Sequence, residues 1–277
     1  MSVEELIRLD VLLPAQGLVK SRRRAKELIE AGQVYLLGAP LTKPARLLPP
    51  DAPVEIRGEM LPYVGRGGLK LEHALEAFSL SVEGLTCADI GASTGGFTDC
   101  MLKRGAARVY AVDVGTDQLD ASLRNDARVT VLEQTDARSL RIPGEIPAHV
   151  DFLTADVSFI SLTLLLPAFR GLLASEGSAV LLVKPQFEAG RAELGKGGIV
   201  RSPSAHRQAL SRVCAAGRQA GLSVRALLPS PIRGGDGAGN REYLALAGAV
   251  SVGGEEELIR HAVAAAFRND TGEGTQE

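Results

Sequence analysis

The 277-residue chain has few of the residues that cross-link a fold, bind metals or span a membrane. Its three cysteines (Cys87, Cys100 and Cys214) cannot form a multi-disulfide framework, and none lies in a CxxC pair, so we interpret them as reduced thiols of a cytosolic protein. The four histidines form no metal-ligand pattern, so no metal is expected. The longest apolar run is interrupted by Pro167 and Arg170 and falls short of the ~20 residues that a membrane span needs. These features exclude secreted disulfide scaffolds, zinc ribbons and membrane-spanning proteins.

The chain also lacks a charge excess of either sign. Lysine and arginine number 31 against 33 acids, a formal charge of 31 − 33 = −2, so no overall basic excess predicts a polyanion partner. Two acids precede the first apolar stretch, which does not fit a signal peptide. The length leaves room for one large domain, or for a large one with a small companion. The 45% apolar and 23% charged residues are ordinary for a globular protein.

The first 60 residues predict a small α/β module. A short amphipathic helix ends near Pro14 to Gly17, and a second is expected between Ser21 as its N-cap and Gly32 as its stop. Short β-like runs broken by glycine and proline follow. We expect a link over 61–80 with a helix from about Leu69, a large domain over 81–268, and a flexible tail over 269–277.

The large domain alternates apolar runs with helical patterns. The runs lie at 86–90, 108–114, 129–133, 151–156, 178–184, 224–229 and 243–248. Near-continuous Val, Leu and Ile runs alternating with helices are typical of a mostly parallel sheet covered on both faces. The fold class is therefore α/β, with a Rossmann-like sheet beside the small N-terminal module.

A glycine-rich loop, DIGASTGGF (89–97), follows the first strand of this sheet and places Gly91 and Ser93 where a ligand is expected. Asp113 ends the next strand, 22 residues after Gly91, where it can bind ribose hydroxyls. Ser93 stands where GxGxxG has its second glycine, which favours a methyl donor over a dinucleotide with a pyrophosphate. Asp136 and Asp156 follow later strands. Asp136 either accepts a bond from an adenine amino group or caps a helix.

Four charged residues are expected at one edge of the sheet. Lys70 lies near the start of a helix, Asp156 and Lys184 follow strands, and Glu242 opens the last strand. If that strand is antiparallel, Glu242 meets Asp156 and Lys184. Burial and neighbouring charges can lower a lysine pKa from its reference of ~10.4, so Lys184 is the candidate base. The alternatives are a solvated lysine at a strand end and a glutamate paired with a nearby arginine.

Seven segments in chain order, YVGRGGLKLEHAL, ADIGASTGGFTDC, YAVDVG, ADVSFISLTLLLP, LLVKPQFE, GKGGIV and GNREYLAL, resemble the TlyA (hemolysin A) family. These are RNA ribose 2′-O-methyltransferases with an S4 RNA-binding domain before an FtsJ-like domain. The resemblance implies a tetrad at Lys70, Asp156, Lys184 and Glu242. It implies S-adenosylmethionine as cofactor, with contacts at Gly95, Gly96, Phe97, Asp113, Asp136 and Asp156. It also implies ribosomal RNA or ribosomal subunits as substrate, with cytidine as the target.

The sequence departs from the family pattern at a few positions. Gly65 stands where serine is expected, Asp136 where asparagine is common, and Arg241 follows Asn240. None of these departures touches the tetrad. In the mechanism we expect, Lys184 is kept neutral by burial and by Lys70, and it takes the proton of the ribose 2′-hydroxyl. Asp156 orients the amine of Lys184, and Lys70 and Glu242 position the sugar and its phosphate.

RNA binding is predicted from a basic segment, KSRRRAK (20–26). It resembles the basic helix face with which an S4 module contacts the RNA backbone. The expected RNA contacts are Arg8, Lys20, Arg22, Arg23, Arg24, Lys26 and Arg66. Without the resemblance, a solvated basic helix face is the simpler interpretation. The Gly-rich segment 188–202, which carries Arg191, Lys196 and Arg201, is either a loop that closes on RNA or a plain surface loop.

Three other functional classes stay open. An RNA-binding protein with an inactive methyltransferase domain is disfavoured by the intact tetrad and glycine loop. A membrane-active hemolysin is suggested by the family's older name, but the sequence shows no signal peptide, no membrane span and no strongly basic amphipathic helix to support it. A Rossmann dehydrogenase would bind NAD instead of S-adenosylmethionine.

Overall fold

The chain folds into two compact units, residues 1–60 and 61–277. This computed structural model describes residues 6–19, 22–30, 32–57, 61–234, 239–250 and 253–268. The tail expected over 269–277, the N-cap expected at Ser21 and the cation Lys20 lie outside the described residues.

In its described residues the N-terminal unit contains the two predicted helices and five short strands. Its elements are β1 (Ile7–Arg8), α1 (Leu9–Ala15), α2 (Arg22–Glu30), β2 (Val34–Leu36), β3 (Ala39–Pro40), β4 (Leu47–Leu48) and β5 (Val54–Ile56). Strand β1 pairs with β4, and β2 lies between β3 and β5, all antiparallel. Leu12 and Leu13 of α1 pack with Leu28 and Ile29 of α2 in one buried cluster. This cluster is the core that a unit of this size needs in order to hold its helices together.

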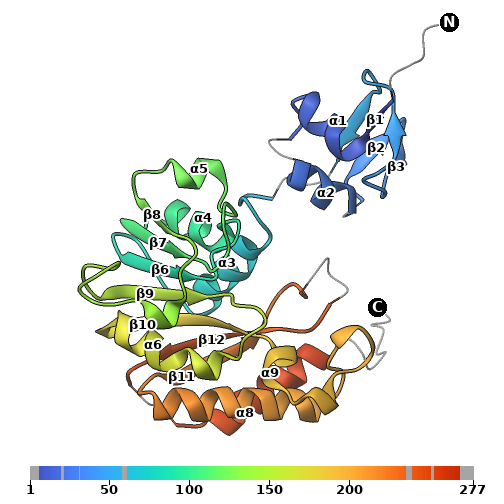
Figure 1. Cartoon of the computed structure of the whole chain (residues 1–277). Helices are drawn as coiled ribbons and strands as arrows, with labels where there is room; N and C mark the ends of the chain where they lie inside the picture. The colour runs from blue at the N-terminus through green and yellow to red at the C-terminus, as the bar shows by residue number, and fades with distance from the viewer. Residues whose placement is uncertain are drawn as a thin grey trace, which may run out of the picture. The chain divides into compact units, whose positions relative to one another are not determined.

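The second unit is built on a seven-stranded sheet (Figure 1). Its strands are β6 (Thr86–Ile90), β7 (Arg108–Val112), β8 (Val129–Leu132), β9 (Val150–Ala155), β10 (Leu173–Val183), β11 (Ser223–Pro229) and β12 (Tyr243–Gly248), in the order β11-β12-β10-β9-β6-β7-β8. Strands β6 to β10 are parallel, whereas β12 is antiparallel to both β10 and β11. The predicted mostly parallel sheet with an antiparallel last strand is confirmed.

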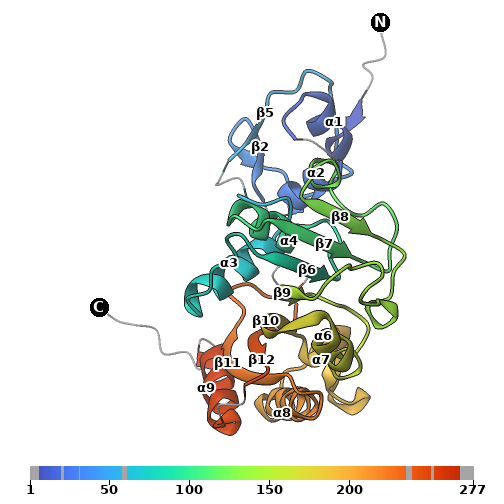
Figure 2. The same cartoon turned by 90° about the vertical axis from the view of Figure 1, so that its left-hand side faces the viewer.

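Helices cover both faces of this sheet (Figure 2). They are α3 (Gly67–Ala77), α4 (Gly96–Lys103), α5 (Ala121–Arg124), α6 (Leu166–Leu172), α7 (Pro185–Glu188), α8 (Pro203–Gln219) and α9 (Glu255–Phe267). The helix expected from about Leu69 begins two residues earlier, at Gly67, and packs against α4 as part of this unit.

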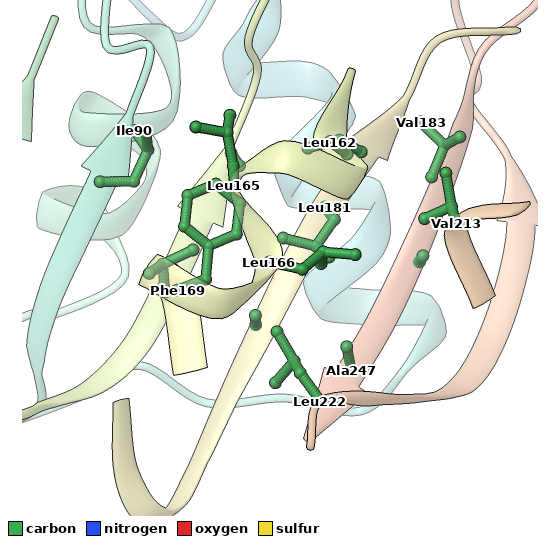
Figure 3. Packing of buried hydrophobic residues seen from close by; sticks show 14 of the residues in the cluster. Ile90, Leu162, Leu165, Leu166, Phe169, Leu181, Val183, Val213, Leu222 and Ala247 are labelled. Carbon is green, nitrogen blue, oxygen red and sulfur yellow. The ribbon is translucent and has the colours of Figure 1, made fainter. Parts of the chain in front are cut away.

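Strand residues alternate between two apolar clusters because successive side chains of a strand point to opposite faces. In β10, Leu181 and Val183 belong to the cluster with α6, α8 and α9, whereas Val180 and Leu182 belong to the one with α3 and α4. Figure 3 shows the first cluster, in which Phe169 of α6 lies among aliphatic side chains of the strands and α8. Both faces are buried, which explains why the central parts of the strands are mostly apolar on both sides.

Candidate active site

The three strand ends lie at one edge of the sheet, on the neighbouring strands β9, β10 and β12. Asp156 directly follows β9, and Lys184 directly follows β10. Val183 pairs with Tyr243 across the antiparallel β10–β12 ladder. Lys184 directly follows β10 and Glu242 directly precedes β12, so the two residues lie at the same end of neighbouring strands.

The four charged side chains form two ion pairs. Lys70, from α3, places its Nζ 2.6 Å from Oε2 of Glu242, and Lys184 places its Nζ 2.6 Å from Oδ1 of Asp156. Lys70 and Lys184 are each 8% exposed and Glu242 is 4% exposed. Asp156 is more accessible, with its side chain 24% exposed. Glu242 pairs with Lys70, so the alternative in which it only pairs with a neighbouring arginine does not describe this carboxylate.

The segment after β9 contributes two residues that the sequence pattern did not single out. The Nζ of Lys184 donates a 2.8 Å hydrogen bond to Oγ of Ser158, so the amine is held between a carboxylate and a hydroxyl. The next residue, Phe159, has φ +64 and is 92% exposed. Its ring lies 5.4 Å, centroid to centroid, from the ring of Phe187 in α7. Positive φ is unfavourable for a bulky residue, and such strain is concentrated at functional sites.

Glu188 ties this segment to the helix that follows Lys184. Its carboxylate accepts hydrogen bonds from the Ser161 hydroxyl (2.5 Å) and from the Leu162 backbone N–H (2.8 Å). Burial raises the pKa of Glu188, although both hydrogen bonds favour the charged form. The segment that carries Asp156 and Phe159 is thus linked through α7 to Lys184.

The glycine loop packs against the edge of the sheet that carries Asp156 and Lys184. Gly91 has φ +79, and a Cβ at this position would lie 2.7 Å from the backbone oxygen of Asp156. A Cβ at Gly96 would lie 3.0 Å from the backbone nitrogen of Gly68, at the start of α3. Glycine is therefore required for two close approaches: one to the strand end that carries Asp156 and one to the helix that carries Lys70. Phe97, also predicted to contact the cofactor, is buried with its ring 3.4 Å from a Cβ at Gly67.

Asp113 organises the loop through both of its carboxylate oxygens. Oδ2 accepts from the Ser93 backbone N–H at 2.8 Å, and Oδ1 accepts from the Gly115 backbone N–H at 2.7 Å. A carboxylate has about four lone-pair sites, so both oxygens keep capacity for a ligand hydroxyl. The adjacent Val114 is 74% exposed and places an apolar surface beside this acid.

Asp136 has the capping role that was left as its alternative. Its carboxylate accepts from the Arg138 backbone N–H at the start of a 3-10 helix (Ala137–Ser139) and pairs with the Arg138 guanidinium at 2.6 Å. These bonds, led by the one from the Arg138 side chain, lower the pKa of Asp136. The carboxylate stays charged at neutral pH, which is the form that accepts a hydrogen bond from an amino group.

Asp89 is a fully buried acid beneath the glycine loop that sequence reasoning missed. It accepts from the hydroxyls of Thr98 in α4 (2.7 Å) and Thr154 in β9 (2.9 Å). Burial raises the pKa of Asp89 to about 6, with the two threonines acting in the opposite direction. Its only signal in the sequence was an acid inside an otherwise apolar strand.

The segment 188–202 is anchored at its C-terminal half. Asn240 accepts from the Val200 N–H (2.8 Å) and donates to the Gly198 carbonyl (3.0 Å). Buried His206 lies between the Val200 carbonyl (2.9 Å from Nε2) and the Tyr243 hydroxyl (2.8 Å from Nδ1). Because a carbonyl only accepts, Nε2 carries the proton, and burial lowers the pKa of this histidine. The segment is thus tied to the start of β12, beside Glu242.

The predicted RNA-contacting cations differ in their burial and in their partners. Arg8 and Arg22 both bond to the buried carboxylate of Asp10, whereas Lys26 is exposed on α2. Arg24 and Arg66 are half-buried, Arg66 at the N-cap of α3, and Arg23 is described only in its backbone. Within the described ranges no group of three or more acids, cysteines and histidines could hold a metal ion, and no helix is long and apolar enough to cross a bilayer.

Comparison with known proteins identifies this architecture. The family model for FtsJ-like methyltransferases matches residues 63–249, and the S4 domain model matches residues 7–54. The chain belongs to the FtsJ-like methyltransferase family and carries an S4 domain at its N-terminus.

Among its relatives is the 16S/23S rRNA (cytidine-2′-O)-methyltransferase TlyA of Mycobacterium tuberculosis, 44% identical over 85% of this chain and 87% of the relative. A Bacillus subtilis protein provisionally named rRNA methyltransferase YqxC is 48% identical over 86% of this chain and 84% of its own. A solved structure from Streptococcus thermophilus, provisionally named a hemolysin, is 44% identical with a TM-score of 0.74, covering 97% of this chain and 99% of that chain. The resemblance seen in the sequence motifs is confirmed.

Proposed function

We propose that this protein transfers a methyl group from S-adenosylmethionine to the ribose 2′-hydroxyl of a cytidine in ribosomal RNA, in the cytoplasm where ribosomes are found. The observation that carries the proposal is two ion pairs, Lys70–Glu242 and Lys184–Asp156, at the edge of a methyltransferase sheet, in which Lys70, Lys184 and Glu242 are buried. Buried charges are costly, and their concentration beside a ligand-binding loop favours chemistry over structural support. The M. tuberculosis relative bears the name of this activity.

The residues around the glycine loop fit S-adenosylmethionine. Gly91 lets the backbone come close to a ligand at the carboxyl edge of the sheet. Asp113 keeps acceptor capacity for ribose hydroxyls, and the exposed side chain of Val114 beside it suits an adenine face. When bound, S-adenosylmethionine would supply a methyl group on a positively charged sulfur, and a carboxylate at this edge of the sheet, such as Asp156, would favour binding of that cation.

Lys184 acts as the base in the proposed mechanism. Once unprotonated, its Nζ would accept the proton of the ribose 2′-hydroxyl, and bound S-adenosylmethionine would supply the methyl group for that oxygen. Asp156 and Ser158 fix the direction of the amine, and Lys70 with Glu242 positions the ribose and its phosphate. A positioned base contributes roughly 10²–10⁴-fold, and orientation supplies much of the remaining acceleration.

In the proposed complex, the base of the target nucleotide stacks on the exposed ring of Phe159. It lies three residues from Asp156, and its solvent-facing surface is aromatic. A base turned out of its RNA stack loses stacking energy that an aromatic side chain replaces in part. The S4 domain supplies phosphate contacts that position the enzyme on RNA without reading the sequence.

The test is methyl transfer from labelled S-adenosylmethionine to small and large ribosomal subunits taken from cells that lack the gene. Label in RNA together with one linkage that resists alkali establishes 2′-O-methylation, and the position of that linkage identifies the nucleotide. Lys184→Ala and the charge-matched control Lys184→Arg should both abolish transfer and still bind the methyl donor, because arginine keeps the charge but does not act as a base. Full activity of Lys184→Arg would remove the base role. Absence of label with confirmed donor binding would favour an RNA-binding role without catalysis.

A further inference from the structure

A single buried carboxylate joins three elements of the S4 domain. Asp10, the second residue of α1, is 0% exposed. Its Oδ1 accepts from Nε of Arg8 in β1 at 3.0 Å, and its Oδ2 accepts from Nη2 of the same arginine at 3.1 Å. Oδ2 also accepts from Nε of Arg22, the first residue of α2, at 2.9 Å. The two guanidinium groups lower the pKa of Asp10, so it remains a carboxylate.

The two arginines still offer donors to solvent. A guanidinium has five N–H donors, and Arg22 bonds to Asp10 only through Nε, which leaves both of its Nη groups outside this bond. The side chain of Arg22 is 55% exposed and that of Arg8 is 43% exposed. The buried ends of both guanidinium groups are therefore fixed while their outer edges face outward.

We propose that Asp10 is a positioning residue that holds Arg8 and Arg22 in the orientation in which they bind RNA phosphates. The inference rests on the proposed function, in which the S4 domain contacts ribosomal RNA. A free arginine loses rotamer freedom when it binds a phosphate, and an arginine already held by a carboxylate has lost it before binding. Asp10 repels RNA through its charge, yet it increases RNA affinity through the two arginines.

This proposal predicts the opposite sign from charge alone. Asp10→Asn raises the charge of the S4 domain by one, so simple electrostatics predicts tighter RNA binding with a steeper salt dependence. The positioning role predicts weaker binding with a shallower salt dependence. Each lost phosphate contact should reduce the slope of log affinity against log salt by about 0.7–0.9.

The experiment measures filter binding of the full-length protein to labelled, deproteinised 23S ribosomal RNA over a series of salt concentrations. The control is Asp51→Asn, which removes an exposed acid of the same domain and should leave binding unchanged or slightly tighter. Asp10→Asn should bind more weakly than both the control and the wild type. Adding Arg8→Ala and Arg22→Ala to Asp10→Asn should cost less affinity than adding them to the wild type, because the arginines are already released.

Each outcome is decisive. Asp10→Asn that binds as tightly as wild type, while Arg22→Ala binds weakly, overturns the positioning role and leaves the RNA-binding function intact. Arg8→Ala and Arg22→Ala that bind as well as wild type overturn both the inference and the RNA role of this surface. If Asp10→Asn loses its circular-dichroism melting transition, the wild-type protein decides through NMR. The Nε–H signals of Arg8 and Arg22 should be protected from solvent exchange without RNA, and rapid exchange of both refutes the proposal.

Discussion

Replacing one partner of the Lys70–Glu242 ion pair should destabilise the methyltransferase domain more than replacing both. The Nζ and Oε2 atoms are 2.6 Å apart, and the residues are 8% and 4% exposed. Either single change leaves the other charge buried without its partner. The variants are Lys70→Met and Glu242→Gln, which keep the side-chain length where Gly234 packs close to the Glu242 carboxylate.

The magnitude follows from the cost of an uncompensated buried charge. Breaking such a pair by removing one partner costs about 3–5 kcal/mol, whereas replacing both partners by neutral residues of similar volume is often nearly neutral. The double variant should therefore be more stable than either single variant. All three should lack methyl transfer, because the proposed mechanism needs both charges of the pair to position the ribose.

The assay is urea unfolding followed by far-ultraviolet circular dichroism, since the chain has no tryptophan to report by fluorescence. The two domains can unfold separately, so the transition of the larger domain is the one compared. Glu257→Gln, which breaks the exposed Arg260–Glu257 pair, is the control and should cost less than about 1 kcal/mol. Additive losses in the double variant, or methyl transfer by it, would refute the reasoning.

Three further predictions concern single residues of the same domain. The pKa of Asp89 is raised from 3.8 to about 6 in the folded state, so its stabilising contribution is present below about pH 4 and is lost as pH rises through 6. Asp89→Asn should abolish this loss, which is about 3 kcal/mol because the shift is about two pKa units at 1.36 kcal/mol each. If the urea stabilities of wild type and variant change in parallel from pH 4 to 7, the prediction is wrong. Asp113→Asn should weaken S-adenosylmethionine binding about tenfold by calorimetry, because hydrogen bonds to a charged acceptor are lost, and an unchanged Kd would exclude the ribose contact. Phe159→Ala should raise KM for ribosomal subunits with little change in donor Kd or stability, because base stacking is worth about 1–3 kcal/mol and the ring is 92% exposed; an unchanged KM removes the stacking role.

The strands were predictable because their signal is local. The run at 86–90 coincides with β6 and the run at 243–248 with β12, since both are mostly apolar and buried. Strand β10 begins five residues before the predicted 178, at Leu173, because its first half pairs irregularly with β9 and includes exposed positions that break the apolar pattern. Composition reports burial, so half-exposed strand ends leave a weak trace.

The candidate site was predictable in its members but not in its contacts. Lys70, Asp156, Lys184 and Glu242 were identified from strand ends and family motifs, and the antiparallel β12 brings the last two together. Ser158 carries no such signal, because a serine after a strand is ordinary until its hydroxyl is found 2.8 Å from an amine.

By itself, the sequence determined the α/β class, the two-part organisation and the edge of the sheet at which chemistry is expected, because hydrophobic periodicity and glycine placement act over a few residues. Only the tertiary structure decided which charges pair. Lys70 meets Glu242 across 172 positions of sequence, and Asp10 meets Arg22 across 12. Such pairing depends on strand register and helix packing, which no local pattern specifies, and it decides whether a buried charge is stabilised.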